Sequence, residues 1–126
     1  MLNIGLDYHD CPRFYNNKTR IVVFYDNESQ HIGVERCLQK WHGYNIQIIF
    51  VNIERFNNHP ENDQFIRCIG YQIKMNWIDK FYIIPQSRKI RQSIRRTFKK
   101  MTDVDIHIKL YSKIVELVYR NSFRKG

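Results

Sequence analysis

Two short apolar segments with an amphipathic stretch between them dominate the first half of the chain. Residues 21–25 and 46–51 are near-continuous runs of β-branched and aromatic side chains, a pattern typical of strands buried on both faces. Residues 30–42 carry apolar side chains at helical spacing, and Gly43 follows where a glycine often ends a helix. The apolar stripe of this helix comprises Val34, Cys37, Leu38 and Trp41. A strand, a helix and a strand joined by short links predict a βαβ unit, in which the two strands are parallel.

The second half of the chain continues the alternation of helices and strands. A short helix is predicted over residues 64–69, with Gly70 as its end, and a strand over residues 81–84. Pro85 stops this strand, because proline has no N–H to donate to a ladder. The longest helix is predicted over residues 104–119. The fold class expected from this order of elements is α/β.

Length and composition restrict the kind of protein. The 126 residues suit one domain, predicted over residues 21–126 after an irregular N-terminal extension of residues 1–20. A hydrophobic share of 43% and an aromatic share of 14% are typical of a folded core rather than of a disordered chain. No apolar run approaches the roughly 20 residues of a membrane-spanning helix, and the start lacks the basic flank and apolar run of a secretory signal. The three cysteines form no CxxC pair, so we expect reduced thiols in an intracellular, reducing compartment.

The first predicted strand ends in a short motif. Tyr25 and Asp26 close the strand, and the predicted helix begins soon after them. This arrangement resembles the DCC thiol-disulfide oxidoreductase family, whose signature has the form Y-D-G-x-C-P-x-C. Tyr25 and Asp26 match that signature, and the chain is also similar to the family's closing pattern from Tyr119 to Arg124. The resemblance extends from Arg20 to Arg124 and implies a thioredoxin-like fold with a central mixed sheet, flanking helices and a short return strand near residues 89–90.

The residues that perform dithiol chemistry in that family are replaced in this chain. Asn27 stands where the family has glycine, and Gln30 replaces the proline. Ser29 and Ile32 stand at the positions of the two cysteines. Dithiol exchange needs a thiolate of lowered pKa and a second thiol close by, which neither a hydroxyl nor an alkyl side chain supplies. Ser29 is therefore expected to cap the helix that follows rather than to react. The vestigial motif, as we call it, comprises Tyr25, Asp26, Ser29 and Ile32.

Other catalytic arrangements find little support in the sequence. The histidines lie in different segments without a paired carboxylate, and five scattered glycines form no phosphate-binding loop. His9 and Cys11 lie near each other, but two candidate ligands without a second pair do not predict a metal site. We therefore expect no enzyme activity, no cofactor and no bound metal. A one-cysteine thiol oxidoreductase that uses Cys37 or Cys68 is an open alternative.

Positive charge is concentrated in one segment of the chain. The formal net charge is +9, and residues 86–101 contain several basic side chains and no acid. Residues 92–100 of this segment are predicted to form a helix. The basic segment comprises Arg88, Lys89, Arg91, Arg95, Arg96, Lys99 and Lys100. Like charges so close together repel unless a partner offsets them, so we expect a contact surface for phosphates, anionic lipid head groups or acidic proteins.

These observations together predict a redox-inactive, thioredoxin-like accessory subunit of a larger assembly. Mitochondrial respiratory complexes and ribosomes are the assemblies in which we expect such a basic domain, with other protein subunits and rRNA as its partners. A free-standing RNA-binding module that uses residues 88–100 is an alternative from a different class. Exposed aromatic side chains would favour it, but the aromatic residues near the basic segment, Tyr82 and Phe98, are expected in the core.

Overall fold

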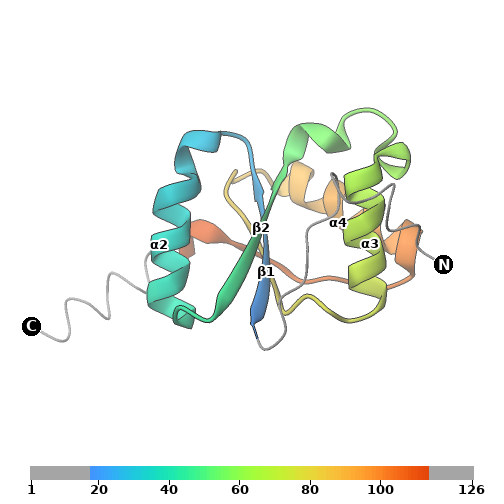
Figure 1. Ribbon diagram of the computed structural model, residues 1–126. Helices are drawn as coiled ribbons and strands as arrows, with labels where there is room; N and C mark the ends of the chain where they lie inside the picture. Colours follow the sequence, from blue (N-terminus) through green and yellow to red (C-terminus); the bar gives the residue numbers. More distant parts are fainter. Residues whose placement is uncertain (1–17, 114–126) are drawn as a thin grey trace, which may run out of the picture.

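Residues 18–113 are described by the computed structural model, and they form a four-stranded sheet with helices on both faces (Figure 1). Strand β1 spans Thr19–Tyr25, β2 Ile46–Asn52, β3 Lys80–Ile83 and β4 Ile108–Leu110. The strands lie in the order β2-β1-β3-β4, and every neighbouring pair is parallel. The α/β class is therefore confirmed, whereas the predicted mixed sheet is wrong for this part of the chain.

The parallel arrangement follows from the helices that separate the strands. Helix α2 spans His31–His42, α3 Gln64–Lys74 and α4 Arg88–Thr102. Each helix carries the chain back to the end of the sheet where the preceding strand began, so the next strand runs in the same direction. Figure 1 shows α2 on one face of the sheet and α3 and α4 on the other. Short 3₁₀ helices follow β1 and β2, namely η1 Glu28–Gln30, η2 Ile53–Phe56 and η3 Pro60–Asn62.

Alternate residues of β1 contribute to two halves of the core. Val22 and Phe24 belong to the half under α3 and α4, where the Phe24 ring packs on Phe98 with centroids 6.2 Å apart. Val23 belongs to the other half and is clustered with Leu38 of α2. All of these side chains are fully buried. A strand that is covered on both faces explains why its sequence is apolar without alternation.

The predicted βαβ unit is confirmed. β1 and β2 pair in parallel along their whole length, and α2 connects them. Gly43 follows α2 with a φ of 87°, which glycine adopts without strain, and its N–H donates to the Gln39 carbonyl. The apolar stripe is only partly correct, because Leu38 is buried whereas Trp41 is 38% exposed.

The predicted N-terminal extension of residues 1–20 is too long. Thr19 and Arg20 belong to β1, and the Arg20 N–H donates to Asp79 Oδ2 at 2.8 Å. The described residues do not include His9, Cys11 or the closing pattern from Tyr119 to Arg124.

Helix α3 is longer than the helix predicted over residues 64–69. Gly70 does not end it but lies buried inside it, and the helix continues to Lys74. A Cβ added at Gly70 would lie 3.3 Å from Met101 Cε and 3.5 Å from Thr102 Cγ2, both on α4. This glycine therefore permits the close approach of two helices rather than terminating one.

Helix α4 includes the residues that were expected to form a return strand. Lys89 and Ile90 lie in its first turn, where the Ile90 N–H donates to Ser87 Oγ at 3.2 Å and the serine caps the helix. The helix predicted over residues 92–100 is present, but it spans Arg88–Thr102. The return strand is therefore wrong, because a capped first turn takes up its residues.

The helix predicted over residues 104–119 is wrong in its first part, where the chain forms β4 instead. Buried and exposed residues alternate here, which is the periodicity of a strand and not of a helix. The buried residues are Ile106 and Ile108, and the exposed ones are Asp105, His107 and Lys109. Residues 111–113 are helical, and the remainder of the prediction lies outside the described residues.

Candidate functional site

The vestigial motif lies at the edge of the sheet formed by the carboxyl ends of the strands. In open parallel sheets, ligands bind at this edge, at the point where the connections after two neighbouring strands leave in opposite directions. In the strand order β2-β1-β3-β4, this point lies between β1 and β3. The Ile84 N–H donates to the Phe24 carbonyl at 2.9 Å and brings the loop after β3 beside the end of β1. Tyr25 is buried at this point, and Asp26 is exposed.

Three of the four side chains of the vestigial motif are exposed, and Tyr25 is buried. The Tyr25 hydroxyl lies 3.5 Å from Glu28 Oε1, and Ile32 is 68% exposed. Ser29 is exposed, and its N–H donates to Asn27 Oδ1 at 3.0 Å. The predicted cap at Ser29 is therefore wrong, because Asn27 caps the 3₁₀ turn η1 and Gln30 occupies the N-cap position of α2, without a capping hydrogen bond from its side chain.

The two cysteines among the described residues differ in state. Cys37 is a free, half-buried thiol on α2. Burial and a hydrogen bond with Cys37 raise the pKa of Tyr111. Cys68 is buried in α3 and is disulfide-bonded, so the expectation of reduced thiols is wrong for this residue. Among the described residues, Cys37 is therefore the free thiol on which the one-cysteine alternative depends.

A hydrogen bond below the surface joins α2 to β3. His42 Nε2 lies 2.9 Å from the Tyr82 hydroxyl. Burial lowers the pKa of His42, and the positive charges of Lys80 and Lys109 lower it further. Burial raises the pKa of Tyr82. Both shifts favour the neutral forms of the two side chains, so the pair is a structural contact between a helix and the sheet.

The lowered pKa of His42 predicts a pH-dependent stability. The unfolded chain binds a proton at His42 more readily than the folded protein does. The contribution of neutral His42 to the free energy of unfolding is therefore complete above about pH 6.5 and is lost as the pH falls through the folded-state pKa. Urea unfolding at a series of pH values below neutrality measures the effect. His42→Gln is expected to flatten the dependence between about pH 7 and pH 5. If the pH dependence of stability is the same in H42Q as in the wild type, other titratable groups cause it.

Helix α4 places most of the basic segment on one exposed face. Its apolar residues Ile94 and Phe98 are fully buried against the sheet side, so the opposite side faces solvent. The exposed basic residues are Arg88, Lys89, Arg95, Arg96, Lys99 and Lys100. Arg91 is half-buried and lies away from the centre of this face. We call these six exposed residues the α4 basic face.

Little negative charge opposes the α4 basic face. Lys99 pairs with Asp103 at 3.6 Å and with Asp105 at 3.4 Å. Lys100 lies near Glu61, whose pKa is lowered first by a backbone hydrogen bond and more weakly by His59 and Lys100. Within residues 18–113, the other members of the face make no ion pair. The face therefore carries a strong positive potential that attracts polyanions.

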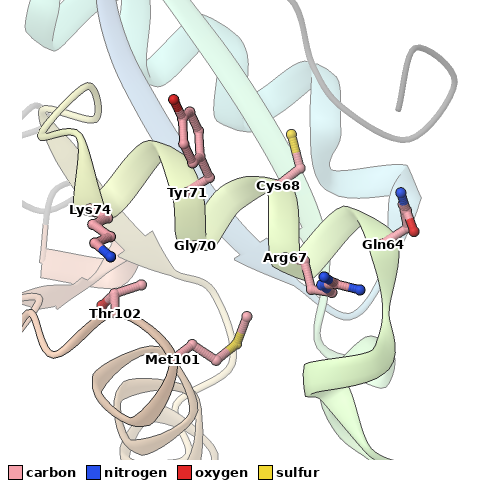
Figure 2. Close-up of a pocket in the computed structure, with 8 residues that line it drawn as sticks. All are labelled: Gln64, Arg67, Cys68, Gly70, Tyr71, Lys74, Met101 and Thr102. Carbon is pink, nitrogen blue, oxygen red and sulfur yellow. The ribbon is translucent and has the colours of Figure 1, made fainter. Parts of the chain in front are cut away.

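Two hollows meet at Met101 on one side of α4. The first has a volume of about 300 Å³ and lies between α3 and α4 (Figure 2). Its polar lining includes Arg67, Tyr71 and Lys74 of α3. The second has a volume of about 390 Å³, and it is lined from α4 by Ser93, Arg96, Thr97 and Lys100. Because Met101 lines both hollows, the outer side of α3 and the α4 basic face adjoin each other at this residue.

Two exposed aromatic residues beside this surface were not identified from the sequence. Tyr71 is 40% exposed and Trp77 36% exposed, and their ring centroids are 5.7 Å apart at an interplanar angle of 78°. The predicted end of the helix at Gly70 left Tyr71 outside any element. The signal that would have found it is the spacing of Arg67, Tyr71 and Lys74, which places them on one side of a longer helix.

No family model, curated protein or solved structure matches the chain. In the described part of the chain, no helix combines the length and apolar character that crossing a bilayer requires. Over the same residues, no three His, Cys, Asp or Glu side chains gather in a way that could hold a metal ion.

Proposed function

We propose that this chain is a non-catalytic RNA-binding subunit of a larger assembly and that the α4 basic face is its RNA contact. One observation carries the proposal: six exposed cations lie on one helix, and only Lys99 is paired with acids among residues 18–113. A solvated helix normally alternates charges, because opposite charges three or four residues apart stabilise it. Phosphate groups would supply the missing negative charge.

The burial of α4 favours RNA over a lipid surface. A helix that binds a bilayer lies in the interface with its apolar side inserted among the lipids. The apolar side of α4 is occupied instead, because Ile94 and Phe98 are fully buried in the core. Only charged side chains are left to meet a partner, and they contact phosphates without needing an apolar environment.

The length of the charged row favours RNA over an acidic protein. A helix of 15 residues is about 22 Å long, and the basic residues extend from its first turn to its last. A nucleic-acid backbone repeats its negative charge without interruption over such a length, whereas acidic side chains on a protein surface are interspersed with others. A ribosome-like assembly is the setting that we propose on this basis.

The replaced dithiol supports the non-catalytic part of the proposal. In a degenerate thioredoxin-like domain of the DCC type, Ser29 and Ile32 would occupy the positions of the reactive cysteines. Neither side chain can exchange a disulfide. The parallel sheet of residues 18–113 departs from the mixed sheet that this resemblance implies, so the RNA contact is proposed independently of the family origin.

Reversing two charges of the α4 basic face tests the RNA contact. The double variant Arg95→Glu and Arg96→Glu is expected to bind a short, labelled oligouridylate at least about tenfold more weakly than the wild type, as measured by fluorescence anisotropy. The slope of log K against log salt is expected to fall by about 1.4, because each phosphate contact on a single strand contributes about 0.7. Both side chains are exposed, so the fold should be retained.

The matched control carries the same charge change on the opposite side of the sheet. Arg36→Glu and Lys109→Glu alter exposed residues of α2 and β4 and should leave most of the affinity intact. Equal losses in both double variants would mean that net charge rather than the α4 basic face governs binding, and the proposal would fail. In cell extracts, the wild-type protein is expected in a large, RNase-sensitive particle from which the α4 variant is lost.

A further inference from the structure

We propose that a single-stranded segment of the bound RNA lies along the outer side of α3, with a base stacked on Tyr71 and its phosphates on Arg67 and Lys74. This inference rests on the function proposed above. In it, the RNA contacts α3 as well as α4, and the part of the RNA on α3 is single-stranded.

Basic and aromatic side chains alternate along α3. Arg67, Tyr71 and Lys74 follow one another at intervals of about one helical turn, so they lie on the same side of the helix. All of them are exposed, and all of them line the hollow of about 300 Å³ between α3 and α4. Figure 2 shows the Arg67 and Lys74 side chains on the side of α3 toward Met101, whereas the Tyr71 ring, which lies between them along the helix, is directed away from Met101. A cation therefore precedes and follows an aromatic ring.

The Tyr71 ring packs against Trp77. In this edge-to-face contact, the edge of one ring meets a face of the other. The ring that contributes its edge therefore keeps both of its faces uncovered by its neighbour. The backbone of Trp77 is tied to β1, because its carbonyl accepts a hydrogen bond from Arg20 Nη1 at 3.2 Å. A ring that packs on a neighbour and is still 40% exposed has less freedom to lose when a base stacks on it.

The outer side of α3 adjoins the α4 basic face. Gly70 lets α3 and α4 approach closely, and Met101 lines both the hollow beside Tyr71 and the hollow beside Arg96. Within residues 18–113, Arg67 and Lys74 make no ion pair with a carboxylate. Positive charge therefore continues from α4 across the helix contact to α3, as a groove that tracks a nucleic-acid backbone requires.

Cations with an aromatic ring between them favour a single strand over the other polyanions. A duplex keeps its bases stacked on one another, so their faces are not available to Tyr71. An acidic peptide would pair with Arg67 and Lys74 but would offer no base to stack. Single-strand binding proteins combine a basic groove with aromatic side chains in this way and tolerate many sequences.

The experiment compares two RNA probes on four proteins. Short oligouridylate and a mixed-sequence RNA duplex of equal length are titrated with the wild type, Tyr71→Ala, Tyr71→Phe and the double variant Arg95→Glu and Arg96→Glu. Tyr71→Ala is expected to weaken oligouridylate binding by about five- to a hundredfold, the range typical of one lost base stack, and to leave duplex binding unchanged. Tyr71→Phe keeps the ring and should bind both probes as the wild type does.

The outcomes separate this inference from the function on which it rests. If Arg95→Glu and Arg96→Glu abolish binding while Tyr71→Ala binds oligouridylate normally, the α4 contact stands and the α3 contact is overturned. If the wild type binds neither RNA, both proposals fail. An oligoglutamate peptide that binds as tightly as oligouridylate and is insensitive to Tyr71→Ala would also overturn the inference, and would assign the surface to an acidic protein.

Discussion

Replacing Phe98 by alanine is expected to lower the free energy of unfolding by about 3–5 kcal/mol. The Phe98 ring is fully buried where α4 meets the sheet. It packs on Phe24 at 6.2 Å and on Phe56 at 5.7 Å between centroids, so its removal leaves a cavity lined by rings that have lost their neighbour. Because domains are stable by only about 5–15 kcal/mol, this one substitution threatens the fold and the position of the α4 basic face.

Thermal unfolding followed by circular dichroism measures the loss. A decrease in melting temperature of at least about 10 °C is expected for Phe98→Ala. Phe98→Leu is the control, because leucine fills more of the space and should cost clearly less. A melting temperature for Phe98→Ala close to that of the wild type would show that α4 is not packed through this residue.

Replacing Leu38 by alanine is expected to cost about 2–5 kcal/mol through the other half of the core. Leu38 is fully buried between α2 and the sheet, where it is clustered with Val23 and Tyr82. α2 is the helix that covers this face in the described part of the chain, so the remaining side chains have little freedom to close the cavity. Urea unfolding measures the change as a lower midpoint at an unchanged slope.

Trp41→Ala is the informative comparison for Leu38→Ala. Both residues belong to the stripe predicted from the sequence, and tryptophan is the larger side chain. Trp41 is nevertheless 38% exposed near the end of α2, so its truncation should cost less than that of Leu38. A loss at Trp41 that equals or exceeds the loss at Leu38 would contradict the orientation of α2.

The elements that the sequence predicted well are those with a local signal. The strand over residues 21–25 and the helix over residues 30–42 are marked by apolar periodicity, and Gly43 marks the end of the helix by its backbone freedom. These signals involve neighbours in the chain only. The return strand expected at residues 89–90 was placed over the first turn of a capped helix. The helix expected over residues 104–110 was placed where buried and exposed residues alternate.

The candidate site was predicted in part, for a related reason. A run of basic residues without acids is visible in the sequence, and the exposed face of α4 contains most of it. Tyr71 and Trp77 belong to another helix and to the loop after it, so no local pattern connects them with residues 88–100. Their position beside the basic surface depends on the close approach of α3 and α4 at Gly70.

The amino-acid sequence by itself determined the α/β class, the βαβ unit and the concentration of positive charge on one helix, because each of these depends on residues close together in the chain. Only the tertiary structure decided that the four strands are parallel, that Gly70 is a helix contact and that Tyr71 lies beside two cations. These features depend on which distant segments pack together. Packing is set by the shape of whole side chains and by the area that they bury, which periodicity alone does not encode.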